Sequence, residues 1–498
     1  MIPPDDPPHA DLSTPQCILH WIERQGDAPA IVERDRTVNY RELGVGIARF
    51  VKALRASSMQ PGMLAGIVCE DRLVHLRLLL ACETLGVATV SLPRSAIVTN
   101  DPILARCDTL CLGAEQTPDQ VRSAGGLLHL SYSFLTWTES LPFTPADLAL
   151  LDHRPADETV VTLVRTSGST GRPKVLAMTH GATRQLIERT TWQPNDPGYA
   201  WNFLNLYNFT NRSSYQESAI ALRRGCVLVL SDMDTVFIDM GRFGQFRTTL
   251  VSGDAVRLTH SVPPGWAEPR AGLVHIKGGA LGPRVRARLR ASVVRHVYHN
   301  YGANEVSRLT MLDDDDVGTL PPGVAIRIMT EAGQPAPPGE TGLIEARAPG
   351  MATFYLWDPE TSGQAFRDGW YRTGDIGFMP APDRLVVLGR ADDWVNLGGI
   401  KFAPGPIEHR IADLPDVEDA VLLSIPVPSG QDVLHIVLQS ADRSVGHRHQ
   451  DAVIAILSGH VDLFMPRVLA SLPRTETGKV RRTVLRHQLA QRSDAVAV

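Results

Sequence analysis

The sequence lacks the features that mark secreted, zinc-binding or membrane-spanning chains. Its six cysteines are scattered over 498 residues, with no CxxC pair and no histidines at zinc-ligand spacing, so we expect free thiols in a reducing cytoplasm. The first fifteen residues lack a basic segment followed by an apolar one, so we expect no signal peptide. The most apolar long window, residues 73–92, contains His75, Arg77 and Glu83, which favours a helix followed by a buried strand over a membrane span.

An excess of positive charge is also missing. Asp and Glu number 54 against 49 Lys and Arg, for a net charge of -5, so the chain has no general attraction for nucleic acid. A basic segment near the end, "KVRRTVLRHQLAQR", is typical of a solvated helix and leaves a local nucleic-acid contact as an alternative. We expect no nucleic-acid partner and a cytoplasmic protein, and oligomeric state is not encoded in any pattern that we find.

What the chain does contain is a regular alternation of elements, over a length that predicts two or more domains. Helical and strand patterns alternate from about residue 37 and again after residue 160, which predicts an α/β fold with parallel sheets covered by helices. Residues 320–375 carry short strands with Gly and Pro turns, which indicates a smaller β layer or barrel. We therefore predict an N-terminal domain over residues 1–388, a hinge at 389–393, and a small α+β domain over 394–498.

One loop, "TSGSTGRPK" at residues 166–174, combines hydroxyl groups, two glycines and a lysine after a strand-like run. Backbone N–H groups, hydroxyls and a lysine are donors that suit a phosphate. The Walker A pattern is absent, because Gly168 and Gly171 are too close together and Lys174 follows a proline. Composition alone leaves a flexible turn and a phosphate site equally open.

The order of further motifs decides between them, because together they resemble those of the adenylate-forming superfamily. This superfamily includes acyl-CoA synthetases, adenylation domains of peptide synthetases and firefly-type luciferases. The motifs that follow the loop in the family's order are "HNYGANE" (299–305), "YRTGD" (371–375), "GRADDWVNLGGIKFAPGPIE" (389–408) and "PRTETGKVRR" (473–482). The resemblance covers nearly the whole chain and implies a large N-terminal domain of two helix-covered sheets plus a small β-barrel, with a mobile small α+β C-terminal domain.

The resemblance also implies a role for individual residues. The phosphates of ATP would be held by Thr166, Ser167, Gly168, Ser169, Thr170, Gly171 and Lys174. The adenine and AMP would contact Gly278, Gly279, Ala280, Asn300, Tyr301, Gly302 and Asn304, and the ribose Asp375 and Arg390. Glu305 would be catalytic as the magnesium ligand, and Lys479 would bridge the substrate carboxylate and the α-phosphate. The hinge and the thiol step would use Asp392, Gly398, Gly399 and Lys401.

Three positions depart from the family pattern. Val175 stands where a glycine usually follows the loop lysine, Asn304 stands where a threonine usually precedes the glutamate, and Asn396 replaces a common lysine. None of them removes a charge that adenylation requires. They leave open an altered rate, or a relative that binds adenylates as a sensor or scaffold without ligase turnover.

The class of the acid substrate is inferred from residues 202–225. Tyr207-Asn208-Phe209 followed by Ser213 resembles the acyl pocket of aryl-acid ligases, and no acidic residue lies between Trp201 and Gln216 to pair with an amino acid's ammonium group. The sequence therefore predicts ATP- and Mg²⁺-dependent activation of an aromatic acid, such as a hydroxybenzoate or cinnamate, with a fatty acid as the alternative. The acceptor would be coenzyme A or the phosphopantetheine of a separate carrier protein.

Overall fold

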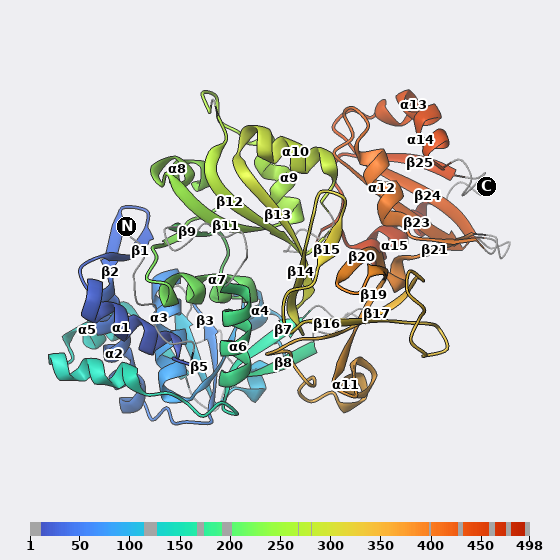
Figure 1. Ribbon diagram of the computed structural model, residues 1–498. Coiled ribbons are helices and arrows are strands. Elements are labelled where there is room, and N and C mark those ends of the chain that lie inside the picture. Colours follow the sequence, from blue (N-terminus) through green and yellow to red (C-terminus); the bar gives the residue numbers. More distant parts are fainter. Residues whose placement is uncertain are drawn as a thin grey trace.

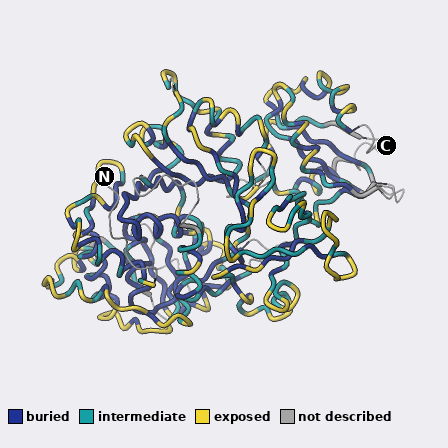
Figure 2. Tube along the Cα trace, in the orientation of Figure 1, coloured by how far each residue is buried: buried dark blue, intermediate teal, exposed yellow. Residues whose placement is uncertain are grey.

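The computed structural model describes residues 11–113, 127–166, 174–191, 202–266, 268–279, 281–397, 400–426, 432–457, 464–474 and 480–493. Figure 1 shows these segments as an N-terminal α/β region, a central antiparallel layer and a smaller C-terminal region at one side. Buried backbone follows the strands, and exposed backbone follows the outer loops and turns (Figure 2). No described helix is both long enough and apolar enough to cross a bilayer.

The first sheet has six strands in the order β6-β5-β3-β4-β7-β8. All neighbours are parallel except β7 and β8, which are antiparallel. The strands are β3 (Leu64–Val68), β4 (Ala88–Ser91), β5 (Thr109–Gly113), β6 (Leu127–Leu130), β7 (Val160–Thr166) and β8 (Lys174–Thr179). The helices of this region are α1 (Thr14–Gln25), α2 (Tyr40–Ala56), α3 (Arg72–Leu85), α4 (Ser95–Val98), α5 (Tyr132–Ser140) and the 3-10 helices η1 (Leu104–Arg106) and η3 (Pro145–Asp152).

Local sequence signals set the limits of these helices. Asn39 caps α2 by accepting a hydrogen bond from the backbone of Glu42, whose side chain in turn accepts one from the backbone of Asn39. The Asp71 side chain caps α3 by accepting a hydrogen bond from the backbone of Val74, and Gly86 ends this helix in the left-handed conformation, with φ 68°. The apolar window noted above is thus α3 followed by strand β4, as predicted.

The second sheet has 14 strands, and the part of it that runs from β2 to β13 is mainly parallel. Its strands are β1 (Pro29–Glu33), β2 (Arg36–Asn39), β9 (Asn202–Asn205), β10 (Leu228–Leu230), β11 (Gln245–Val251), β12 (Arg270–Lys277) and β13 (Val294–Ala303). The accompanying helices are α6 (His180–Thr191), α7 (Arg212–Arg223), α8 (Val236–Arg242), α9 (Ser252–His260) and α10 (Pro283–Ser292). The predicted pair of helix-covered sheets is confirmed.

The predicted small β layer is present. Strand β14 pairs with β13 and so makes this layer a continuation of the second sheet. Within the described residues the strand order is open, with β16 at the edge. Its elements are β14 (Ser307–Leu312), β15 (Val317–Thr319), β16 (Ala325–Met329), β17 (Gly342–Arg347), β18 (Phe366–Arg367), β19 (Trp370–Ala381), β20 (Arg384–Arg390) and α11 (Pro359–Ala365).

The C-terminal region is α+β and has cores of its own, whose members all lie within residues 395–490. A three-stranded sheet, β23-β24-β25, and a two-stranded sheet, β21-β22, form it. The strands are β21 (Val395–Leu397), β22 (Ile400–Phe402), β23 (Asp419–Pro426), β24 (Asp432–Gln439) and β25 (Phe464–Leu469). The helices are η4 (Ala391–Asp393), α12 (Pro404–Ala412), α13 (Val445–Arg448), α14 (Gln450–Leu457) and α15 (Arg482–Ser493).

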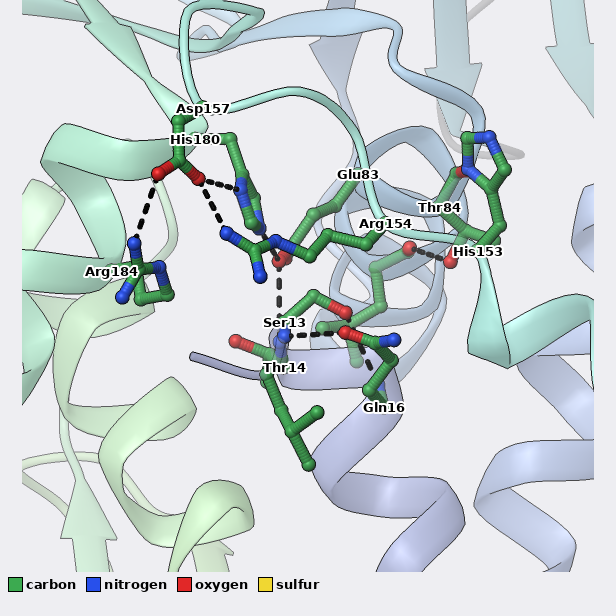
Figure 3. A network of polar contacts seen from close by, with 12 residues as sticks. Ser13, Thr14, Gln16, Glu83, Thr84, His153, Arg154, Asp157, His180 and Arg184 are labelled. Atoms are coloured by element: carbon green, nitrogen blue, oxygen red, sulfur yellow. Dashed lines mark hydrogen bonds and ion pairs between the residues drawn. The ribbon is translucent and has the colours of Figure 1, made fainter. Parts of the chain in front are cut away.

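A polar network fixes α6 against the N-terminal region. His180, the first residue of α6, lies between two carboxylates, with Nδ1 3.5 Å from Asp157 and Nε2 3.9 Å from Glu83 (Figure 3). Glu83 on α3 also accepts hydrogen bonds from the backbone of Thr14 at 3.3 Å and from the hydroxyl of Tyr215 on α7 at 2.6 Å. The network therefore ties together α1, α3, α6 and α7.

Candidate active site

The predicted phosphate loop joins two paired strands. Thr166, the last residue of β7, and Lys174, the first of β8, are register partners in the antiparallel pair. The loop residues Ser167, Gly168, Ser169, Thr170 and Gly171 lie outside the described residues. The two ends of the loop are therefore held together by the sheet, which places Lys174 at the sheet's edge.

Val175, the departure directly after this lysine, packs in the core. Its side chain is 9% exposed within an apolar cluster that includes Leu110 and Leu163. Its carbonyl accepts a hydrogen bond from the backbone of Leu356 at 2.7 Å. A valine here adds buried apolar surface and β propensity to β8. It therefore stabilises the strand that follows the loop.

Glu305 lies in the turn between β13 and β14 and is buried, with 6% exposure. The hydroxyl of Tyr355 donates to its Oε1 at 2.8 Å, and the backbone N–H of Ala352 donates to its carbonyl at 2.7 Å. Lys174 stands over the ring of Tyr355, with Nζ 4.9 Å from the ring centre. The structure thus brings the lysine of one predicted motif and the glutamate of another to the same tyrosine.

Sequence reasoning did not identify Tyr355 or its neighbour Tyr371 as part of the site. Burial raises the pKa of both phenols, and the charge of Glu305 raises it further. Both side chains are therefore neutral hydrogen-bond donors at physiological pH. Tyr355 stands in "TFYLWDPE" among other aromatic residues, and no local pattern separates it from a core aromatic.

The predicted ribose residues are paired across two strands. Asp375 on β19 and Arg390 on β20 are register partners, and Arg390 Nη1 lies 3.4 Å from Asp375 Oδ1. The hydroxyl of Tyr301, predicted to stack on adenine, donates to Asp375 Oδ2 at 2.7 Å. Burial raises the pKa of this phenol, as does the Asp375 charge. Three residues from separate motifs thus form one group.

The predicted adenine residues lie at the ends of β12 and β13. His299 Nε2 lies 2.8 Å from the carbonyl oxygen of Gly279, and Asn300 Nδ2 lies 3.2 Å from His275 Nδ1. Gly302 permits a close approach of β14, because a Cβ there would lie 2.0 Å from the carbonyl oxygen of Ser307. Gly278 has φ 84°, and Ala280 lies outside the described residues.

A buried charged cluster that sequence reasoning missed lies beside these glycines. Lys277, the last residue of β12, contacts Glu217 Oε1 at 3.2 Å, and Arg247 contacts Glu217 Oε2 at 3.4 Å. Burial would raise the pKa of Glu217, but the charges of Arg247 and Lys277 outweigh burial and lower it. His275 lies near this cluster, and burial lowers its pKa well below the usual range.

The four residues predicted to line the acyl pocket differ in their exposure and in their contacts. Phe209 is buried and lines a small cavity, whereas Asn208 is exposed and Ser213 is half-buried in the first turn of α7. The hydroxyl of Tyr207 donates to Asp254 at 2.8 Å and accepts from the backbone of Val251 at 2.9 Å. The assignment of these residues to the acyl group stays a prediction.

Among the site residues predicted for the hinge, the thiol step and the catalytic lysine, only Asp392 has a described side chain. Asp392 is exposed, with Oδ2 4.0 Å from Arg390 Nη2. Gly398, Gly399 and Lys479 lie outside the described residues, and of Lys401 only the backbone is described. Arg474 and Val480 form a β-bridge on either side of residues 475–479.

The donor set around Glu305 fits a magnesium ion shared with phosphates. No group of three or more His, Cys, Asp or Glu side chains suited to a metal occurs in the described part of the chain. Mg²⁺ is commonly bound by one or two carboxylates, with phosphate oxygens and water completing its coordination. A single buried carboxylate beside the predicted phosphate loop is such an arrangement.

Known proteins share this architecture. At 25% identity, a feruloyl-CoA synthase from an Amycolatopsis species is similar over 84% of this chain and 86% of its own. An indoleacetate–CoA ligase from Aromatoleum aromaticum is also 25% identical, over 96% and 99% of the two chains. The solved anthranilate CoA ligase in complex with anthranoyl-AMP shares the fold, with TM-score 0.81 and 18% identity over 96% of this chain and 97% of its own. The family model described as AMP-binding enzyme matches residues 18–356, more than half of the chain, and the protein therefore belongs to this family.

Proposed function

We propose that this protein is an AMP-forming acid:thiol ligase. A carboxylate oxygen of the acid attacks the α-phosphorus of ATP, the bond to the β-phosphate oxygen breaks, and pyrophosphate leaves. A thiol then attacks the acyl carbonyl and AMP leaves. The observation that carries this proposal is the meeting of Lys174, Tyr355 and Glu305, with Tyr301, Asp375 and Arg390 forming a second polar group.

Different residues of the site have different roles in the first step, the formation of the acyl adenylate. Lys174 and the donors of residues 166–171 bind the β- and γ-phosphates, and Asp375 with Arg390 binds the ribose. A magnesium ion held by Glu305 and phosphate oxygens would supply positive charge that offsets the charge on the departing pyrophosphate. Lys479 would approach from the C-terminal region and stabilise negative charge between the carboxylate and the α-phosphate. We further propose that residues 394–498 turn about residues 389–393 before the thiol step.

We propose an aromatic acid as substrate and coenzyme A as acceptor, with a carrier protein's phosphopantetheine as the other source of the same thiol. Several relatives are named as CoA ligases of aryl acids, among them a 3-hydroxybenzoate/4-hydroxybenzoate–CoA ligase of Thauera aromatica. The six cysteines are all free thiols, which supports a reducing compartment such as the cytoplasm.

Pyrophosphate exchange into ATP tests the proposal directly. We expect exchange that depends on an acid, tested with hydroxybenzoates, cinnamates, medium-chain fatty acids and amino acids. Lys479→Ala should lower this exchange by about two or more powers of ten, as for loss of one preorganised electrostatic contact.

Three results would correct the proposal. Exchange with fatty acids alone would overturn the aromatic substrate. Near-wild-type exchange by Lys479→Ala would remove that lysine from catalysis. ATP binding without exchange on any acid would instead indicate an adenylate-binding sensor or scaffold.

A further inference from the structure

Two arginines hold the turn that carries Glu305, one on each side of it. Arg212, in the first turn of α7, donates to the carbonyl oxygen of Asn304. Arg189, near the end of α6, donates from Nη2 to the carbonyl oxygen of Val306 at 2.5 Å. The two helices lie side by side in Figure 1. Both cations therefore reach the site from the side of α6 and α7.

Arg189 has more hydrogen-bonding capacity than its surroundings use. Its Nε and Nη1 atoms are buried without a hydrogen-bond partner in the described structure. No carboxylate is within ion-pair distance of it among the described residues, and burial lowers its pKa to about 10. Buried N–H groups and buried charges are rarely left without partners in folded proteins. The arrangement therefore indicates a place for an anion.

Arg212 is part of the same electrostatic group. Burial lowers its pKa to about 10, with the Glu305 carboxylate opposing this shift and the Arg189 charge adding to it. The carboxylate that acts on Arg212, that of Glu305, already accepts a hydrogen bond from Tyr355. One further negative charge would balance the group.

The position of this group separates it from the phosphate loop. Arg212 Nη2 lies 3.8 Å from the sulfur of Met178, whereas Lys174 begins the same strand, β8, four residues earlier and about 13 Å away along it. Arg212 also lines a cavity of about 50 Å³ together with Phe209, Leu186, Ile187 and Tyr215. An anion held by the arginines would have an apolar surface beside it.

We propose that Arg189 and Arg212 bind the carboxylate of the acid substrate next to Glu305. This inference rests on the proposed ligase function and extends it to the second substrate. A carboxylate approaching a triphosphate is repelled by it, and two guanidinium groups offset that repulsion while orienting both carboxylate oxygens. The triphosphate occupies the side of Lys174 and Tyr355, and the acid occupies the side of α6 and α7.

The test compares Arg189→Met, Arg189→Lys and a matched control in pyrophosphate exchange. With an acid that supports exchange in the wild type, Arg189→Met should raise the KM for the acid at least tenfold and change the KM for ATP less than threefold. Arg189→Lys should recover part of the loss, because it restores the charge without the planar fork. The control is Arg184→Met, which removes another arginine of α6 that pairs with Asp157 and Asp11 and should leave both KM values unchanged.

A neutral analogue gives a second readout. The primary amide of the same acid, used as a competitive inhibitor, should bind wild type and Arg189→Met within threefold of each other, because it carries no charge for the arginines. A raised KM for ATP with an unchanged KM for the acid would assign the arginines to the triphosphate and overturn the inference. Unchanged KM values with a lowered melting temperature would show a purely structural clamp and also overturn it. Failure of the ligase function itself is seen separately, as absence of acid-dependent exchange in the wild type.

Discussion

At the scale of single residues, Tyr355 connects the two parts of the proposed phosphate site. Its hydroxyl donates to Glu305 and its ring lies under the ammonium group of Lys174. A carboxylate that is held at one oxygen by a neutral donor keeps the other oxygen in a fixed direction for a cation. The tyrosine therefore positions Glu305, while its ring contributes a cation–π contact to the lysine.

Tyr355→Phe removes the hydrogen bond to Glu305 and keeps the ring. A hydrogen bond to a charged group contributes about 1.5–3 kcal/mol, so we expect kcat/KM for ATP in pyrophosphate exchange to fall by roughly 10- to 100-fold. The Mg²⁺ concentration giving half-maximal rate should rise, because the carboxylate is less well oriented. Steady-state exchange over a range of Mg²⁺ concentrations measures both effects.

Tyr40→Phe is the matched control for this variant. It removes the hydroxyl of another buried tyrosine, which donates to the carbonyl of Cys226 at 2.8 Å. We expect it to lower thermal stability without changing the Mg²⁺ dependence. Equal Mg²⁺ dependence in Tyr355→Phe and the wild type would contradict a positioning role.

At the scale of elements, buried histidines connect α3 and α6 to the rest of the N-terminal region. His75 on α3 is 3% exposed, and its ring nitrogens lie 3.0 Å from the carbonyl oxygen of Cys69 and 2.9 Å from the hydroxyl of Ser91. Burial lowers the pKa of His75 to about 4, and burial also lowers that of His180 despite its two carboxylate neighbours. Both histidines are therefore neutral in the folded protein at pH 7.

Acidification should destabilise the protein through His75 before it protonates most carboxylates. The unfolded state binds a proton near pH 6.5 and the folded state near pH 4, so no penalty exists above about pH 6.5 and it grows as the pH falls to about 4. The full effect is about 3 kcal/mol, with a slope of about 1.4 kcal/mol per pH unit. Urea unfolding of wild type and His75→Gln at pH 7 and pH 5 measures it.

The variant should lose less stability than the wild type between these two pH values. His487→Gln, which replaces an exposed histidine of α15, should behave as the wild type does. If wild type and His75→Gln lost the same free energy of unfolding from pH 7 to pH 5, a neutral buried His75 would be ruled out.

The helices and strands also show which features of the fold the sequence alone can predict. Helix α2 follows the alternation of helical and strand patterns predicted from about residue 37, because amphipathic spacing arises within one element and needs no partner. The continuity of the small β layer with the second sheet was missed, because the pairing of β14 with β13 depends on strand register. Arg189 and Arg212 were missed for a similar reason. An arginine in a polar helix is usually solvated, and only the tertiary fold brings these two to the turn at Glu305.

At the scale of the whole molecule, the N-terminal and C-terminal regions meet across a cleft between α9, α10 and α12. Its volume is about 540 Å³, and charged side chains line both walls. Arg284 on α10 crosses it, with Nη1 donating to the carbonyl oxygens of Asp413 and Leu414 at 3.3 and 2.9 Å. These carbonyls follow the end of α12, where a cation is favoured by the helix dipole. Arg284 therefore stabilises the arrangement of the two regions seen in Figure 1.

Arg284→Ala should weaken this arrangement without unfolding either region. Because the contact is partly exposed, we expect a modest loss of about 1 kcal/mol, which corresponds to roughly fivefold faster amide hydrogen exchange at residues 413–419 and at the proposed hinge, 389–393. Hydrogen exchange followed by mass spectrometry measures this, with the β11–β12 peptides as an internal reference that should not change. Arg288→Ala, on the same helix with a contact to His260 at 3.3 Å, is the control and should leave exchange at 389–393 as in the wild type. Identical exchange in Arg284→Ala and wild type would show that other contacts hold the two regions together.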